Sequence, residues 1–322
     1  MRALITLVFV TLVYAQAPAP RPFTVVRLDP ALDAIIATDA KLEILREHFG
    51  LTEGPVWIQE NGGGYLLFSD CARHRYLEHR PANRQRATGD SADRIQRPAL
   101  DPQGRLVITA MADRTVTRLE KDGKRTVLAD RYEGKRLSGP NDVVVKSDGA
   151  VYFTDSVNGL RGGAIGPLRE LPFNGVYRVK DGSITLLDSD RDRPGEFPNG
   201  IAFSQDEKHL YVTAGFGKTL RWDVQPDGSI ANPKTFIPAG NDGMKVDRKG
   251  NVYSTNVVGP GEIWITSPEG KHLGTLQLPQ IQGEPRPRIC ATNEAFGDAD
   301  GKGLYITSCT HLFKVRLKAS AR

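Results

Sequence analysis

The sequence is poor in the residues that carry soft-metal, redox and covalent chemistry. Its 322 residues include three cysteines, and none of these lies in a Cys-x-x-Cys pair or a haem-attachment motif. No Gly-x-Ser-x-Gly segment offers a serine nucleophile, and the six histidines are scattered along the chain. These absences argue against zinc-finger, haem and serine-hydrolase chemistry, and they favour oxygen ligands if a metal ion is bound.

Charge is also limited, because the formal net charge of +5 is modest for this length. We therefore expect no nucleic-acid partner. The one marked apolar segment opens the chain: a basic start, a short apolar stretch and a small-residue site before Gln16 predict a signal peptide over residues 1–15. The stretch is too short to favour a membrane span, so we expect export to the periplasm or the medium, with no membrane span after cleavage.

Export implies an oxidising compartment. Cys290 and Cys309 are 19 positions apart and can pair if neighbouring strands bring them together, which would leave Cys71 unpaired. A Pro-rich leader and a closing strand are expected over residues 16–40, ahead of one domain over 41–318.

That domain is built from repeats. Six stretches share a turn rich in Gly or Asp, followed by a strand that ends in a small or hydroxyl residue. Their equivalent strand positions are separated by 41, 45, 59, 42 and 52 residues. This is the period of a four-stranded propeller blade. The equivalent positions are Tyr65, Leu106, Val151, Leu210, Val252 and Leu304.

The sequence therefore predicts an all-β, six-bladed propeller. Asp-Gly turns between apolar runs indicate the hairpins within each blade, and the one short helix is expected from Asp29 onward, with Pro30 at its first position. Because open sheet edges are a liability, we expect residues 25–28 to close the ring by pairing with residues 312–317. The alternative is an open β-sandwich.

Four oxygen-bearing side chains precede the apolar runs of separate repeats. If the repeats surround an axis, these side chains converge on one point. Two carboxylates and two amide oxygens would match the charge of a hard divalent cation and leave positions for water and substrate. We therefore predict a metal site, with Ca²⁺ preferred and Zn²⁺, Mn²⁺ or Mg²⁺ as alternatives. The predicted ligands are Glu53, Asn141, Asn199 and Asp242.

Each of these residues also has a simpler interpretation. Asn141 and Asn199 follow proline, so each one alone fits an ordinary turn. Glu53 alone fits a surface carboxylate at a strand end, and Asp242 before a glycine fits a turn. The occurrence of all four at equivalent repeat positions favours the ligand interpretation.

Further polar residues are candidates for binding substrate. The segment 70–97 carries seven arginines, which suggest either a solvated loop face or a basic wall for an acidic substrate. Arg97 is the candidate contact from this segment. Arg136 and Glu170 lie in loops that we expect to cover the same end of the propeller.

The motifs resemble the SMP-30/gluconolactonase/luciferin-regenerating-enzyme family over most of the chain. The matching segments are residues 53–57, 140–143, 198–201 and 242–244. The resemblance implies a six-bladed propeller with one divalent ion, usually calcium, that hydrolyses a lactone. It places the metal at the four predicted ligands, and Asp242 also falls where a general base is commonly assigned.

Two segments depart from the family pattern. Many gluconolactonase-type members carry Asn-Gly before the strand of the second blade, where this chain has Gln96, Arg97 and Pro98. After Asp155, Ser156 and Val157 replace a common Pro and aromatic residue. The sequence thus predicts metal-dependent lactone hydrolysis, with a sugar lactone such as gluconolactone as substrate and Asp242 as the base or water-orienting group. We expect a monomer. The alternatives are an exported binding propeller with a structural calcium ion, and a related esterase or phosphotriesterase.

Overall fold

The structure is a computed structural model of the chain. It describes residues 21–320, apart from positions 74, 82, 91–95, 161, 216, 240–241, 257–260, 281–288 and 319. The predicted signal peptide lies outside the described residues. In the described part, no helix is long and apolar enough to cross a membrane.

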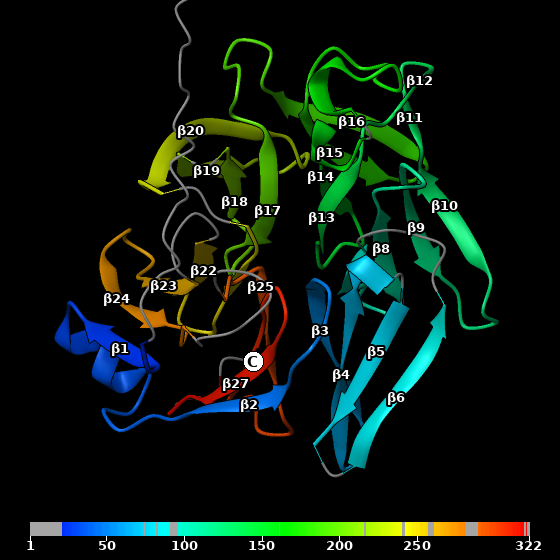
Figure 1. Ribbon diagram of the computed structural model, residues 1–322. Coiled ribbons are helices and arrows are strands. Elements are labelled where there is room, and N and C mark those ends of the chain that lie inside the picture. Colours follow the sequence, from blue (N-terminus) through cyan, green and yellow to red (C-terminus); the bar gives the residue numbers. More distant parts are fainter. Residues whose placement is uncertain are drawn as a thin grey trace, which may run out of the picture.

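Six antiparallel sheets surround a common axis (Figure 1), which confirms the propeller. Blade 1 contains β3 (Thr52–Glu60), β4 (Gly63–Asp70), β5 (Arg75–Arg80) and β6 (Asn83–Asp90). Blade 2 contains β7 (Gln96–Leu100), β8 (Leu106–Ala110), β9 (Thr115–Leu119) and β10 (Arg125–Ala129). Blade 3 contains β13 (Pro140–Val145), β14 (Val151–Asp155), β15 (Gly175–Lys180) and β16 (Ser183–Ser189).

The remaining blades follow in chain order. Blade 4 contains β17 (Pro198–Phe203), β18 (His209–Ala214), β19 (Lys218–Val224) and β20 (Ile230–Ile237). Blade 5 contains β21 (Met244–Val246), β22 (Val252–Asn256), β23 (Glu262–Thr266) and β24 (His272–Gln277). Blade 6 contains β25 (Asn293–Gly297), β26 (Gly303–Thr307) and β27 (Leu312–Arg316).

Short elements complete the chain. The hairpin of β11 (Arg131–Tyr132) and β12 (Lys135–Arg136) precedes blade 3. The 3₁₀ turns are η1 (Pro30–Ala34), η2 (Cys71–Arg73), η3 (Val157–Gly159) and η4 (Gly163–Ile165). The predicted cap of η1 is confirmed, since the Asp29 carboxylate accepts a hydrogen bond from Ala31 N at 2.8 Å.

An N-terminal strand closes the ring, but it is not the expected segment. β2 (Leu42–Arg46) pairs with β27 and supplies the fourth strand of blade 6. β1 (Thr24–Arg27) instead adds a fifth strand to blade 5 beside β24, as Figure 1 shows. The predicted pairing of residues 25–28 with the last blade is therefore wrong. The physical reason is that blades 5 and 6 each have an outer strand with an edge to which an N-terminal segment can pair. Val25 packs on the apolar cluster beneath β24 of blade 5.

The apolar core lies between neighbouring blades. Phe153 and Tyr177 stack with ring centroids 5.2 Å apart in the cluster that joins blades 2 and 3. Trp57 of blade 1 stacks on Tyr305 of blade 6 at 5.5 Å. Because these contacts hold the blades together from their faces, the axis is left open for polar side chains at the starts of the inner strands.

A disulfide connects Cys290 and Cys309, whose Cα atoms are 5.4 Å apart, and Cys71 is buried and free. The Cys309 carbonyl accepts a hydrogen bond from Thr52 N at 3.2 Å. The disulfide therefore lies next to the first inner strand of the propeller, immediately before Glu53.

Candidate functional site

The inner strands begin at one end of the axis, and their second residues form the site. Glu53, Arg97, Asn141, Asn199 and Glu294 are the second residues of β3, β7, β13, β17 and β25, respectively. Asp242 lies two residues before β21. We call Glu53, Arg97, Asn141, Asn199 and Asp242 the polar ring.

Backbone irregularities aim three of these side chains. The pairing register shifts between Glu53 and Val56 in blade 1, and between Pro140 and Val143 in blade 3. Blade 4 has the same shift directly after Pro198. A bulge bends a strand and redirects its side chains. This local feature turns the Glu53 and Asn199 side-chain oxygens toward the Arg97 guanidinium, whereas the Asn141 amide nitrogen lies 4.0 Å from Met111 Sδ.

Buried hydroxyls hold the ring backbone from the preceding blades. Thr109 Oγ1 donates to the Asn141 carbonyl at 2.8 Å, and Thr154 Oγ1 donates to the Asn199 carbonyl at 2.6 Å. Thr154 Oγ1 also accepts a hydrogen bond from Asp142 N at 3.0 Å. These two hydroxyl residues therefore connect Asn141 and Asn199 to the preceding blades.

The polar ring is centred on the Arg97 guanidinium. Nη2 donates to Glu53 Oε1 at 2.9 Å and also to Asp242 Oδ1. Nη1 donates to Asn199 Oδ1 at 3.2 Å. Three of the four predicted metal ligands thus bind one arginine, while Asn141 Oδ1 is buried and has no hydrogen-bond partner among the residues that the structure describes.

Arg97 is enclosed by acidic groups. Its Nη1 also lies 3.7 Å from Asp142 Oδ2, and the residue is 3% exposed. Burial by itself lowers the pKa of Arg97, but the Asp242, Glu53 and Asp142 carboxylates outweigh burial, so the pKa ends well above its usual value. Burial raises the pKa of Glu53, and Arg97 opposes that rise. Arg97 is therefore a permanent cation inside the ring.

The ring in this arrangement does not fit a divalent ion. A metal ion bound to the Glu53, Asn199 and Asp242 oxygens would have to take the position of the guanidinium that they already bind. Two cations cannot share one small oxygen cage without strong repulsion. Among the residues that the structure describes, no three His, Cys, Asp or Glu side chains are arranged to hold a metal.

Asp242 is the most open acidic member of the ring. Its side chain is 15% exposed, against 4% for Glu53 and Arg97. Its backbone is fixed from blades 5 and 4: Asp242 N donates to the Thr255 carbonyl at 3.0 Å, and the Asp242 carbonyl faces Gly200. Water or a substrate that reaches the ring from outside therefore meets Asp242 before it meets Arg97.

Gly200 sets the distance between blades 4 and 5. A Cβ added there would lie 2.1 Å from the Asp242 carbonyl oxygen. We expect Gly200→Ala to displace Asp242 and to lower the free energy of unfolding by about 1–3 kcal/mol in a urea titration. Gly217→Ala in the same blade is the control, because its Cβ would meet nothing within 4 Å. Equal stability of the two variants would contradict this role.

Two acidic residues of the site, Asp142 and Glu294, lie outside the predicted set of four ligands. Asp142 accepts hydrogen bonds from Val143 N at 2.9 Å and from Ile201 N at 3.3 Å, so it joins blades 3 and 4. Glu294 is fully buried, and within the described part of the chain neither of its carboxylate oxygens has a hydrogen-bond partner. The signal for Glu294 was its position, since it precedes the last repeat turn as Asn199 precedes an earlier one.

The predicted loop residues lie together. Arg136 N donates to Glu170 Oε2 at 2.8 Å, and Arg114 Nη1 lies 3.4 Å from Glu170 Oε1. The β11–β12 hairpin is thereby tied to the insertion of blade 3. Contact of Arg136 or Glu170 with a substrate stays a prediction.

Arg97 does not lie on a solvated loop face, because it is buried among carboxylates. Other arginines of the segment are also paired: Arg73 and Arg75 lie 3.4 Å and 3.5 Å from Asp70 Oδ2. The side chains at 84, 86 and 94 lie outside the described residues. The contact of Arg97 with a substrate stays a prediction.

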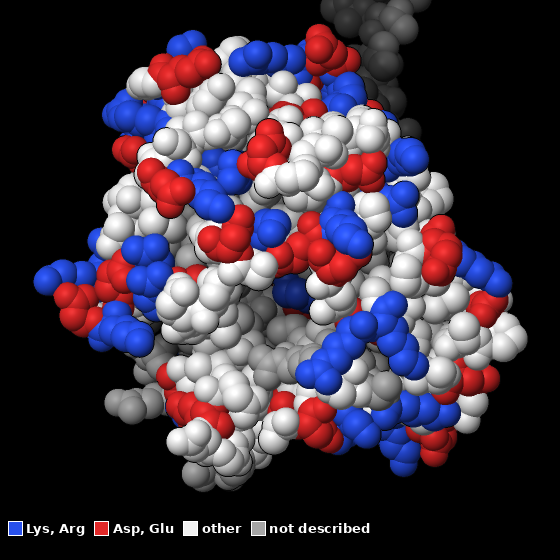
Figure 2. Space-filling model, turned by 180° about the vertical axis from the view of Figure 1, so that it is seen from behind, with Lys and Arg blue, Asp and Glu red and all other residues white. Residues whose placement is uncertain are grey.

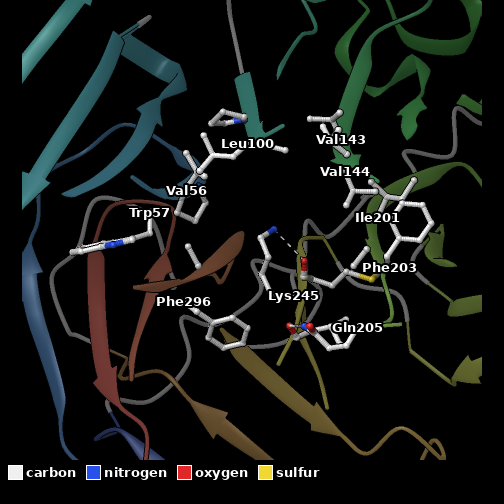
Figure 3. Close-up of a pocket in the computed structure, with 18 of the residues that line it drawn as sticks. Val56, Trp57, Leu100, Val143, Val144, Ile201, Phe203, Gln205, Lys245 and Phe296 are labelled. Atoms are coloured by element: carbon white, nitrogen blue, oxygen red, sulfur yellow. Dashed lines mark hydrogen bonds between the residues drawn. The ribbon is translucent and has the colours of Figure 1, made fainter. Parts of the chain in front are cut away.

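A separate axial cavity of about 430 Å³ begins where the polar ring ends. Its walls come from the residues that follow the ring on the inner strands, and Lys245 extends into its middle (Figure 3). A hollow with a basic side chain at its floor is visible near the centre of the face in Figure 2. Labelled lining residues include Val56, Leu100, Val143, Ile201, Phe203 and Phe296.

Comparison with known proteins now decides the family. The pattern of the SMP-30/gluconolactonase/LRE-like region matches residues 51–310. The chain belongs to this family. A Zymomonas mobilis protein named gluconolactonase is 29% identical over 328 aligned residues, which cover 91% of this chain and 86% of the relative.

Solved structures of family relatives agree in fold. The structure of a Xanthomonas campestris gluconolactonase is 30% identical, with a TM-score of 0.77 and coverage of 94% of this chain and 98% of that chain. Regucalcin from Agrobacterium tumefaciens, described as a calcium-binding protein, is 19% identical with a TM-score of 0.66, over 87% of this chain and 96% of that one. At that identity the second likeness shows the shared fold alone.

Proposed function

We propose that this protein hydrolyses a lactone at the polar ring, with a sugar lactone such as gluconolactone as the first candidate substrate. Membership of a family with gluconolactonase relatives supports the reaction class. One observation carries the location: Asp242 is the ring carboxylate that reaches the opening, with its side chain 15% exposed. A reacting group must be accessible to water and substrate, whereas the other ring carboxylate, Glu53, is only 4% exposed.

In this proposal Asp242 accepts a proton from a water molecule that attacks the lactone carbonyl carbon. The ring C–O bond of the lactone breaks, and the released alkoxide takes up the proton that Asp242 had accepted from the water. Arg97 holds the Asp242 carboxylate in place through its Nη2 contact. The positive charge of Arg97 at the floor of the polar ring stabilises the negative charge that develops on the carbonyl oxygen of the lactone.

The predicted calcium ion enters this proposal only as an alternative. It would use Glu53, Asn141, Asn199 and Asp242 after Arg97 had left them, and no step above depends on it. Export remains part of the proposal, because residues 1–15 have the pattern of a signal peptide. The Cys290–Cys309 disulfide fits an oxidising compartment.

The test is an acid-release assay on the mature chain with aldonolactones and uronolactones, once with EDTA and once with added Ca²⁺, Zn²⁺, Mn²⁺ or Mg²⁺. Turnover of one or more lactones supports the proposal, and the preferred lactone defines the substrate. Aryl esters and phosphotriesters belong in the same panel, because turnover of these alone would indicate another hydrolase. No turnover on any of them would reject hydrolysis and favour a binding propeller.

A further inference from the structure

We infer that Arg97 is a built-in cation that takes the place of a divalent metal ion in the polar ring, so that the folded protein does not need calcium. The inference concerns what holds the ring together. It is measured by metal binding and stability, and it therefore stands or falls independently of lactone hydrolysis.

Arg97 joins several blades of the propeller. It extends from β7 of blade 2, and its guanidinium binds Glu53 of blade 1 and Asn199 of blade 4. It also binds Asp242, directly before blade 5, and lies 3.7 Å from Asp142 of blade 3. A cation that gathers oxygens from several blades does the structural work of a central metal ion.

Arg97 also balances the negative charge of the site. Glu53, Asp142 and Asp242 bring three carboxyl groups to the ring, and Arg97 is the cation in contact with all three. A buried carboxylate without a compensating charge is costly. If Arg97 were lost, the same oxygens would form a hard, acidic cage of the kind that calcium binds.

Arg97 is also held in place. The side chain is 4% exposed, and its own backbone is fixed because Arg97 N donates to Thr109 Oγ1 at 3.4 Å. A flexible surface arginine could leave when an ion arrives. Arg97 would have to break its bonds to Glu53 and Asn199 and leave a closed site.

The experiment begins with the wild-type mature chain, stripped with EDTA and titrated with calcium by calorimetry and by thermal melting. We expect no binding heat and a melting temperature that stays within about 1 °C. The key variant is Arg97→Gln, which removes the cation and keeps a side chain of moderate length. We expect it to melt well below the wild type in EDTA, and calcium in large excess over its dissociation constant should raise its melting temperature by roughly 5 °C.

Two further variants test whether the calcium response depends on losing the positive charge at position 97, or follows from the loss of any arginine that binds carboxylates. Arg97→Lys keeps a positive charge and should show no response to calcium. Arg105→Gln is the matched control, because Arg105 also binds two carboxylates of blade 2, at Asp101 and Glu120, but lies outside the ring. It should show no response to calcium either.

Stoichiometric binding of calcium to the wild type, with a rise in melting temperature like that of Arg97→Gln, would overturn the inference. So would an Arg97→Gln variant that folds but gains no calcium response. If Arg97→Gln yields no folded protein, the wild-type titration and Arg97→Lys decide: binding of calcium by either one rejects a built-in cation, and indifference of both supports it.

Discussion

Asp242→Asn is expected to lower kcat for lactone hydrolysis by about a thousandfold while the melting temperature changes little. A general base typically contributes two to four orders of magnitude to the rate. The asparagine side chain has nearly the same shape, and its oxygen can still accept a hydrogen bond from Arg97. It cannot take a proton from the attacking water. The measurement is the rate of acid release at saturating substrate, with a thermal melt of the same preparation.

Loss of charge beside Arg97 is a rival explanation for such a result. Asp142→Asn removes a carboxylate from the same guanidinium at 3.7 Å, but this side chain is only 4% exposed and binds backbone N–H groups of two blades. We expect it to lower the free energy of unfolding by about 1–3 kcal/mol and to lower kcat by less than tenfold. That contrast would assign the rate effect to proton transfer at Asp242.

The outcome has a clear converse. If Asp242→Asn keeps a near-wild-type kcat, Asp242 is not the base and the proposed mechanism fails. If both variants lose activity equally, the charge around Arg97 matters more than the identity of the carboxylate. The role of Asp242 would then be to position Arg97.

Most of the fold followed from sequence because one structural unit recurs. Each blade begins with an inner strand whose start carries a polar residue, and an Asp- or Gly-rich turn then leads to a strand that ends in a hydroxyl residue such as Thr109 or Thr154. The spacing of the repeats predicted where each blade lies in the sequence. The shared position of Glu53, Asn141 and Asn199 predicted that they meet. Each lies at an equivalent bulge, and Glu53 and Asn199 meet at Arg97.

The errors have physical causes. Residues 25–28 and 42–46 are both short extended segments that can pair with an open strand edge. Their alternation of apolar and polar residues does not indicate which blade each one pairs with. Arg97 belongs to a segment rich in charge, which favours a solvated surface. Only the carboxylates that other blades supply make burial of a guanidinium favourable, and these long-range partners are not visible in local sequence. Its position, second in an inner strand like Glu53, was the available signal.

Glu294 leads to the second large prediction, which concerns stability and pH. Burial raises the pKa of this carboxyl to about 8; Lys245 opposes the rise, and Asp142, Asp242 and Glu53 add to it. A folded-state pKa above the unfolded value of roughly 4.3 means that the fold prefers the protonated acid. The stability from this group is therefore fully present below about pH 4 and is lost as the pH rises through about 8.

The size of this loss is bounded by the difference in pKa. At about 1.4 kcal/mol per unit, the free energy of unfolding falls by up to roughly 5 kcal/mol between about pH 4.5 and pH 8. Glu294→Gln cannot ionise and keeps a similar volume. We expect the variant and the wild type to melt at similar temperatures at pH 5. At pH 8 the variant should melt higher, by roughly 5 °C.

A matched control tells this effect apart from the general response of the protein to pH. Glu269 is exposed, and its carboxylate accepts a hydrogen bond from Ser267 Oγ at 2.7 Å, which lowers its pKa. Glu269→Gln should therefore follow the wild-type melting curve from pH 5 to pH 8. If Glu294→Gln also follows it, Glu294 does not titrate in this range, and the buried carboxyl has a partner that keeps it ionised. If only the melting curve of Glu294→Gln departs from the wild type, Glu294 is a neutral acid at pH 7. Only some of the carboxyl groups around the polar ring are then charged and available to a cation.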